Sequence, residues 1–152
     1  MIAFASVADA SEPDLHLLTD AGLEIAPILF DGKVYAFVVP GGVRQLRLRS
    51  RVSRSAETTG LSIDDRRAFG VLVGDVGVST GRRRRISGLH LSTQALAGWH
   101  DVERQATCRW TDGDASLPVD LSMSNGCPVF LDIQVIQAGP YEMPSAGDML
   151  PA

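Results

Sequence analysis

Two tryptophans, Trp99 and Trp110, stand in a segment rich in charged residues that runs from Gly98 to Asp114. An exposed indole presents a flat apolar face that can stack on a sugar ring, while guanidinium, imidazole and carboxylate groups bond to the sugar hydroxyls. On this hypothesis the segment binds carbohydrate. The alternative is that both indoles are buried and anchor the core, because large aromatic side chains usually stabilise the interior. The candidate ligand-binding residues are Trp99, His100, Glu103, Arg109, Trp110 and Asp112.

Four consecutive arginines, Arg82 to Arg85, form the strongest charge feature of the sequence. Such a run can contact phosphate groups or an acidic polysaccharide. It is also typical of a solvated hairpin turn whose alternating arginines lie on the outer face of a strand. We favour the hairpin interpretation, because the patch is small and the whole chain carries a formal charge of −4.

The sequence lacks the common short motifs of catalytic, nucleotide and metal sites, including Gly-x-Gly-x-x-Gly, Gly-x-Ser-x-Gly and His-Glu-x-x-His. Asp112-Gly113-Asp114 offers two close carboxylates, but a calcium site needs about six to eight oxygen ligands, so we expect a tight turn instead. We expect no catalytic residues, no metal and no cofactor. A jelly-roll enzyme is a third hypothesis, and its site would use His16, His90, His100, Glu103, Asp112 and Asp114.

The chain has two cysteines, Cys108 and Cys127, and both fall in strand-like stretches. Two are too few for a disulfide scaffold. The geometry of neighbouring strands allows a single disulfide, and the sequence does not decide whether the two cysteines form it. In a reducing compartment both would be small buried hydrophobic residues, which is the interpretation we favour.

Short apolar segments with alternating polar residues recur along the chain, separated by clusters of Gly, Pro, Asp and Ser. This spacing is typical of strands in a sandwich or barrel. The clearest alternation, Leu46-Arg47-Leu48-Arg49, predicts inward leucines and outward arginines. The expected strands lie near residues 14–18, 23–30, 33–39, 46–49, 68–78, 107–111, 115–121 and 128–137, with a further strand that starts within the arginine run.

The connecting segments carry their own signals. Asp31-Gly32 predicts a hairpin with a type I′ turn. Residues 50–67 lose the alternation and predict a long loop, whereas residues 89–97 predict a single helical turn. Glycines at 70, 74 and 77 indicate a bulge or a close backbone approach.

Together these features predict one all-β domain, an antiparallel β-sandwich of the jelly-roll or immunoglobulin-like type. It has about eight to ten short strands and at most one or two short helical turns. The domain is expected to span residues 1–138. Residues 139–152 hold three prolines and little to bury, so we expect a flexible C-terminal tail.

Composition limits the classes of partner. Hydrophobic residues make up 45% of the 152 residues and charged residues 21%, as in globular domains. The acidic net charge argues against nucleic acid. No apolar run reaches the ~18 residues that a membrane span needs. The stretch Met1–Asp9 lacks the basic residues of a signal peptide, and its aspartate ends the apolar part, so we expect a cytoplasmic chain.

Short motifs resemble two groups of bacterial β-sandwich modules. One group is appended to polysaccharide glycosyltransferases and related cell-surface proteins, and the other lies beside the Hint (hedgehog/intein-type) region of α-proteobacterial proteins. The resemblance implies a non-catalytic sandwich that works near glycan synthesis or the cell surface, although this chain carries neither a glycosyltransferase nor a Hint domain. The first likeness rests on Gly98-Trp99-His100, Glu103, Arg109-Trp110-Thr111-Asp112-Gly113, Ala115 and Leu117, and the second on residues 13–17, 47–50 and 65–71.

The leading hypothesis is therefore a non-catalytic accessory or binding module whose partner is a glycan or a glycan-synthesis protein. The alternative is a structural or protein-interaction subunit that forms a homo-oligomer through sheet faces or edges. Its basis is the pair of nearly continuous apolar strands at residues 69–78 and 129–136.

Overall fold

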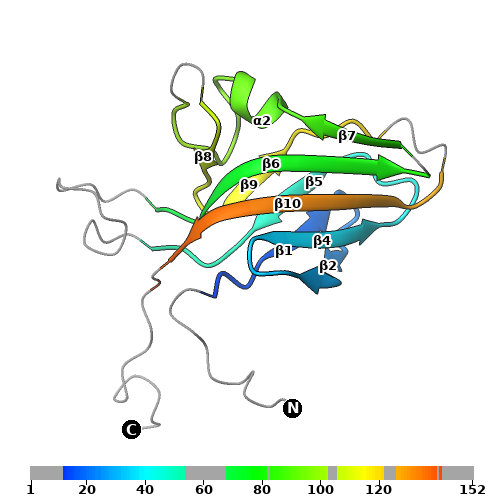
Figure 1. Ribbon diagram of the computed structural model, residues 1–152, viewed down its shortest axis with the longest axis horizontal. Coiled ribbons are helices and arrows are strands. Elements are labelled where there is room, and N and C mark those ends of the chain that lie inside the picture. The colour runs from blue at the N-terminus through cyan, green and yellow to red at the C-terminus, as the bar shows by residue number, and fades with distance from the viewer. Residues whose placement is uncertain are drawn as a thin grey trace, which may run out of the picture.

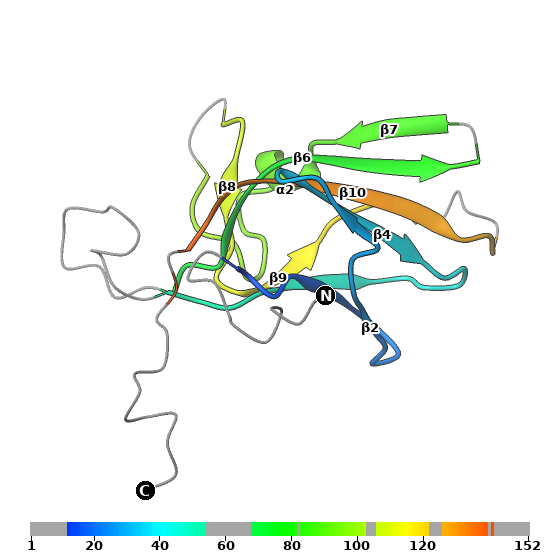
Figure 2. The ribbon, with the colours of Figure 1, turned by 60° about the horizontal axis from the view of Figure 1, so that its bottom comes forward.

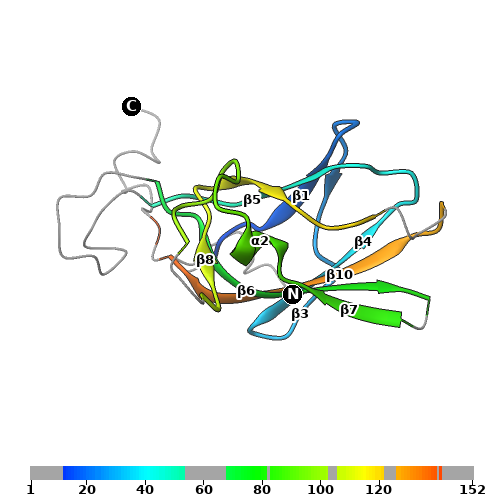
Figure 3. The same ribbon diagram turned by 90° about the horizontal axis from the view of Figure 1, so that it is seen from above.

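A computed structural model describes residues 12–53, 68–81, 83–102, 106–121, 126–139 and 141. Two antiparallel sheets face each other, as the edge-on view in Figure 3 shows. The first sheet, sheet A, has the strand order β2 (Glu24–Ile25), β1 (His16–Thr19), β5 (Leu46–Arg49), β9 (Asp114–Leu117). The second, sheet B, has the order β3 (Leu29–Phe30), β4 (Val34–Val39), β10 (Val129–Ala138), β6 (Val71–Thr80), β7 (Arg83–Ser87).

The remaining elements lie at one end of sheet B. Strand β8 (Arg109–Trp110) pairs with β6 at Val73 and Leu72, whereas β7 pairs with the other end of the same strand. Figure 2 shows β7 and β8 at these two ends of β6. One short helix, α2 (Leu89–Ser92), follows β7. The expected all-β sandwich, with ten short strands and one helical turn in the described residues, is thus confirmed.

Strand alternation builds the core between the sheets. On β5, Leu46 and Leu48 are buried while Arg47 is exposed, as the sequence predicts. On β10 the four residues expected to share a face, Val129, Leu131, Ile133 and Val135, are all buried. They pack with side chains of sheet A in one continuous hydrophobic cluster. Burial of this apolar surface is the main term that stabilises the sandwich.

The glycines of β6 mark the irregularity that their spacing predicts. The register between β6 and β10 shifts twice, between Ile133 and Val135 and again before Gln137. Side chains of β10 lie directly over β6, so a Cβ added at Gly77 would overlap the carboxylate of Asp132. A side chain at this position would force the carboxylate of Asp132 to move, so glycine suits the close approach of the two strands.

Two local expectations are wrong. The predicted strand 23–30 is divided, since β2 belongs to sheet A and β3 to sheet B. Pro27 lies between them and cannot donate a ladder hydrogen bond, which accounts for the break. The Asp31-Gly32 hairpin forms, but Phe30 pairs with Tyr35, so its loop is longer than a type I′ turn.

The loop gains its shape from the side chain of Asp31. Its Oδ1 accepts hydrogen bonds from the backbone N–H groups of Lys33 (2.9 Å) and Val34 (2.8 Å). These bonds lower the pKa of the carboxyl group. Gly32 has a φ of +103°, whereas Asp31 does not enter the positive-φ region that a type I′ turn requires of both residues.

The ordered chain continues beyond the expected domain end at residue 138. Tyr141, which the sequence assigns to the tail, is buried, and its hydroxyl donates a 2.7 Å hydrogen bond to the carbonyl of Gly70. The guanidinium of Arg51 lies 5.0 Å from the centre of its ring. Residues 54–67 of the expected long loop lie outside the described residues, but Ser53 and Phe69 pair at its base.

Candidate functional site

The tryptophan segment crosses from one sheet to the other. Strand β8 belongs to sheet B and β9 to sheet A, and the Asp112-Gly113 turn between them has the glycine at φ +102°. Residues 98–100 run antiparallel to this crossover. The backbone N–H of His100 donates to the carbonyl of Trp110, and that of Asp112 donates to Gly98. The segment is therefore a hairpin that joins the two sheets at one end of the sandwich.

Trp99 belongs to the core. Its side chain is 8% exposed and packs in the main hydrophobic cluster. The indole Nε1 donates a 2.6 Å hydrogen bond to the carbonyl of Ser116. Its ring also lies 5.4 Å from the imidazole of His90. With its polar edge bonded and its faces packed, Trp99 fits the alternative that the sequence left open, a buried anchor.

Arg109 is also buried, with 2% of its surface exposed. Its guanidinium donates four hydrogen bonds to backbone carbonyls, those of His100 (2.6 Å), His90 (2.9 Å), Thr93 (2.6 Å) and Gln94 (2.7 Å). Burial lowers the pKa of the guanidinium, but arginine starts from so high a value that the charge is kept. Arg109 thus fastens helix α2 and the segment after it to β8, and its donors are used within the fold.

The other predicted residues lie nearer the surface. Trp110 is half-buried, with its ring edge-on to Phe69 at 5.5 Å, and His100 is tilted on the same phenyl ring at 4.5 Å. A His100 ring nitrogen lies 2.5 Å from the carbonyl oxygen of Ala68. Asp112 is exposed and accepts a bond from the N–H of Asp114. Glu103 lies outside the described residues.

The structure places Arg83 and Arg85 of the arginine run beside a cleft of about 270 Å³. The cleft lies on the side of the β6–β7 hairpin that faces the chain after β9. We call it the arginine cleft. It is lined by Val78, Thr80, Arg83, Arg85, Ile86, Ser87, Gly88, Leu89 and Asp120.

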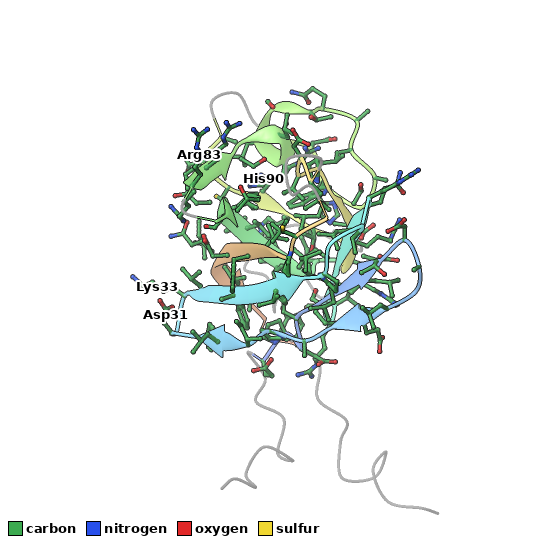
Figure 4. The ribbon with its side chains drawn as sticks, turned by 90° about the vertical axis from the view of Figure 1, so that its right-hand side faces the viewer. Asp31, Lys33, Arg83 and His90 are labelled. Atoms are coloured by element: carbon green, nitrogen blue, oxygen red, sulfur yellow. The ribbon has the colours of Figure 1, made fainter. Side chains whose placement is uncertain are left out.

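Strand alternation divides the arginines of β7 between two faces. Arg84 lies on the outer face of sheet B and forms an ion pair with Asp132, with bonds of 2.7 and 3.1 Å. This pairing raises the pKa of Arg84. Arg83 and Arg85 lie on the opposite face, in the cleft. Within the described part of the chain neither has a hydrogen-bonded or ion-paired partner. Figure 4 shows Arg83 at the rim of the molecule and His90 deeper inside.

The far wall of the arginine cleft comes from the other side of the sandwich. Asp120 lines it there, three residues beyond the end of β9. The hydroxyl of Ser87 and the carbonyl of Pro118 lie 3.5 Å apart and join the two walls at the base. Leu89, the first residue of α2, adds an apolar surface that is about half exposed. The cleft therefore combines two guanidinium groups, one carboxylate and apolar walls.

His90, the residue after Leu89 in helix α2, does not line the arginine cleft. It is buried, and its Nε2 lies 2.7 Å from the carbonyl of Gly74 on β6, which places a proton on Nε2. Burial lowers the pKa of the imidazole, and the nearby charge of Arg109 lowers it further, while the bond to Gly74 acts in the opposite direction. His90 has the geometry of a packing residue.

Metal and cysteine chemistry find no support in the described residues. No group of three or more His, Cys, Asp and Glu side chains lies close enough there to hold a metal ion. Asp114 instead pairs with Arg47 at 2.7 Å. Cys108 and Cys127 are both free thiols. Cys127 is exposed, so the expectation that both are buried is wrong. No helix in the described ranges is long and apolar enough to cross a membrane.

No family model, no curated protein and no solved structure matches the chain. The function is therefore inferred from the structure of the chain. The sequence indicates the arginine run but not the cleft, because Asp120, which is distant from β7 along the chain, reaches it only in the folded sandwich.

Proposed function

We propose that this chain is a non-catalytic binding module and that it binds a saccharide in the arginine cleft. The observation that carries the proposal is the pair Arg83 and Arg85. Both point into a concave, partly apolar site, and neither is paired within the described residues. Guanidinium groups that no contact among the described residues uses can donate to a ligand. The resemblance to modules near glycan synthesis, seen in the sequence, points to the same class of ligand.

The cleft suits a small polar ligand with an apolar side. Its volume of about 270 Å³ is just below the roughly 300–1,000 Å³ of typical small-molecule sites, so one sugar unit fits better than a long segment. Val78 and Leu89 offer apolar surface for the ring carbons. Asp120 and the hydroxyls of Thr80 and Ser87 offer acceptors for sugar hydroxyls.

The proposal moves the site away from the predicted tryptophan segment. Trp99 and Arg109 are committed to the core and to helix α2, so they are not available for a sugar. Trp110, His100 and Asp112 keep some exposed surface and remain the second place to look for a bound sugar.

A blocking substitution tests the site directly. We expect Leu89→Trp to fill the cleft and to abolish binding of oligosaccharides on a glycan array and in isothermal titration calorimetry. Leu29→Trp makes the same exchange at a more exposed position on sheet B, outside the cleft, and should bind like the wild type. Equal binding by both variants would show that the sugar binds elsewhere, and Trp110→Ala would then test the tryptophan segment.

The outer face of sheet B supports a second candidate function, self-association. Leu29, 69% exposed, and Ile86, 54% exposed, lie on one cross-strand row through Ala36, Asp132 and Gly77. Phe130, 51% exposed, lies on the same face one row away. Large apolar side chains gathered on one sheet face are typical of protein contacts.

Sedimentation velocity over a hundredfold range of concentration tests this second function. If the face joins two copies, the wild type should change from monomer to dimer, and Phe130→Asp should remain a monomer. Leu23→Asp adds the same charge at an exposed leucine before β2 and is the matched control. A wild type that stays monomeric at every concentration would exclude this function.

A further inference from the structure

We infer that the ligand of the arginine cleft is a saccharide that carries a single carboxylate on its sugar unit, as a uronic acid does. The inference rests on the proposed function and names the ligand class for the same site. The two guanidinium groups and Asp120 together determine this choice.

The first step concerns the two guanidinium groups. Arg83 and Arg85 are two residues apart on one strand, so their Cα atoms are about 6.6–7 Å apart and their side chains leave the same face. Two neighbouring cations that the described fold does not neutralise repel each other, and an anion placed between them removes that repulsion. Arginine binds a carboxylate with two parallel hydrogen bonds, which gives such a contact direction as well as charge.

Arg84, which lies between these two residues on β7, is paired within the fold. Arg84 is held by two hydrogen bonds to the carboxylate of Asp132 on the outer face. On the outer face a carboxylate thus binds the guanidinium of Arg84. Arg83 and Arg85, on the same strand, have no such partner among the described residues. A ligand carboxylate in the cleft would give Arg83 or Arg85 the contact that Arg84 already has.

The second step concerns the opposite wall. Asp120 places a carboxylate in the cleft and also has an interaction within the fold. A carboxylate has several lone pairs, so it can accept a further hydrogen bond, whereas a ligand that is anionic at every position offers it no donor. A hydroxyl group, in contrast, donates a hydrogen bond to a carboxylate. The cleft therefore fits a ligand with one acid group at the β7 side and hydroxyls at the Asp120 side. A sugar ring with one carboxylate has this arrangement, whereas a heavily sulfated sugar has not.

The third step concerns the field of the whole molecule. The chain is acidic, with a formal charge of −4, so long-range attraction does not draw anions to it. Binding then depends on short-range contacts in the cleft. We expect its salt dependence to be that of about one or two exposed charge pairs, not that of a polyanion site.

Titration calorimetry with two matched sugar series tests the inference. The probes are short oligomers of galacturonic acid and oligomers of galactose of the same length, with sodium acetate and inorganic phosphate as sugar-free anions. We expect the wild type to bind the uronate series at least about tenfold more tightly than the neutral series. Acetate and phosphate should compete only weakly, because they make none of the ring and hydroxyl contacts.

Variants of β7 give the control within one strand. Arg83→Gln/Arg85→Gln should weaken uronate binding at least about tenfold and galactose binding by less, so that the preference for the uronate series is lost. Arg84→Gln removes a charge from the outer face of the same strand and should change uronate binding less than about twofold. All three positions are exposed, and thermal unfolding of each variant confirms that it is folded.

These measurements distinguish a failure of the carboxylate inference from a failure of the proposed saccharide-binding function. If both sugar series bind equally and the double variant changes neither, the carboxylate inference is wrong while the saccharide-binding function stands. If phosphate or acetate binds as tightly as the uronates, the cleft is a simple anion site and the inference is also wrong. If no sugar of either series binds, the proposed function itself is overturned.

Discussion

Nη1 of Arg109, on β8, donates a 2.9 Å hydrogen bond to the backbone carbonyl oxygen of His90 in helix α2. This bond joins the end of sheet B to the helix that begins at the wall of the arginine cleft. His90 in turn contacts the carbonyl of Gly74 on β6. The position of the cleft wall thus depends on two buried side chains that do not line the cleft themselves.

Arg109→Lys tests the importance of the guanidinium fork. A lysine ammonium cannot reach four carbonyls that the planar fork of Arg109 now bonds together, and it is costly to bury without them. We expect the free energy of unfolding to fall by about 2–4 kcal/mol, measured by urea denaturation. Arg47→Lys is the matched control in the exposed pair with Asp114, where the change should be below about 1 kcal/mol. Equal losses for both variants would contradict the role of Arg109.

His90 predicts a pH dependence of stability. Burial lowers its pKa in the folded chain, so the unfolded chain, with a pKa of about 6.5, takes up a proton that the folded chain resists. Below that value the unfolded state binds more protons, and the free energy of unfolding should fall as the pH drops from 7.5 to 5. Asp20 and Asp31 also have lowered pKa values, but their effect is confined to pH values near and below their ordinary value of 3.8.

His90→Gln isolates this effect, because a glutamine amide can still donate to the carbonyl of Gly74 but does not titrate. Urea denaturation at several pH values should give a flatter profile between pH 7.5 and 5 for this variant. A wild-type profile that is already flat in this range would show that His90 is not held neutral.

Gly98 and Gly22 separate backbone strain from steric overlap. Both have a positive φ, +85° and +87°, but a Cβ at Gly22 meets nothing within 4 Å. A Cβ at Gly98 would overlap the backbone of Asp114 and Ala115. We expect Gly22→Ala to cost about 1–2 kcal/mol of unfolding free energy and Gly98→Ala to cost at least about 2 kcal/mol more. Similar losses at the two positions would mean that the hairpin at 98–100 moves aside freely.

The two tryptophans should behave differently in fluorescence and stability. Trp99→Phe leaves the carbonyl of Ser116 without its 2.6 Å bond and a gap in the core, which should cost about 2–4 kcal/mol. Trp110 is half-buried, so Trp110→Phe should cost less. The emission of the Trp110→Phe variant, which comes from Trp99 alone, should resist quenching by acrylamide. Quenching as strong as that of free tryptophan would contradict the burial of Trp99.

The sequence predicts strands well where one face is apolar. Leu46-Arg47-Leu48-Arg49 and residues 129–135 of β10 alternate strictly, and burial of one face determines which of their side chains point inward. The sequence predicts the structure less well where individual hydrogen bonds determine the conformation of a loop or of the chain beyond β10. Asp31 uses its side chain to shape a longer loop, and Tyr141 is buried only because Gly70 accepts its hydroxyl. The bonds of Asp31 are local, whereas that of Tyr141 joins distant parts of the chain, and the apolar pattern of the sequence indicates neither.

The candidate site shows the same division. A run of arginines is visible in the sequence, but which of them are paired depends on the register of β7 with β6 and of β6 with β10. That register places Asp132 beside Arg84 and leaves Arg83 and Arg85 on the other face. The residues next to Arg109 in the sequence do not show whether its guanidinium is buried against backbone carbonyls or exposed to a ligand. The sequence alone therefore cannot assign its role.

The place of β10 in sheet B has a consequence for synthesis of the protein on the ribosome. β10 is the last of the described strands along the chain, yet it lies between β4 and β6, as Figure 1 shows. Until residues 129–138 emerge from the ribosome, β4 and β6 lack their shared neighbour and expose unpaired backbone groups and the apolar side chains of the core. We therefore expect the sandwich to close only after β10 has been made, and a nascent chain stalled before this point would present two open sheet edges to chaperones and to other chains.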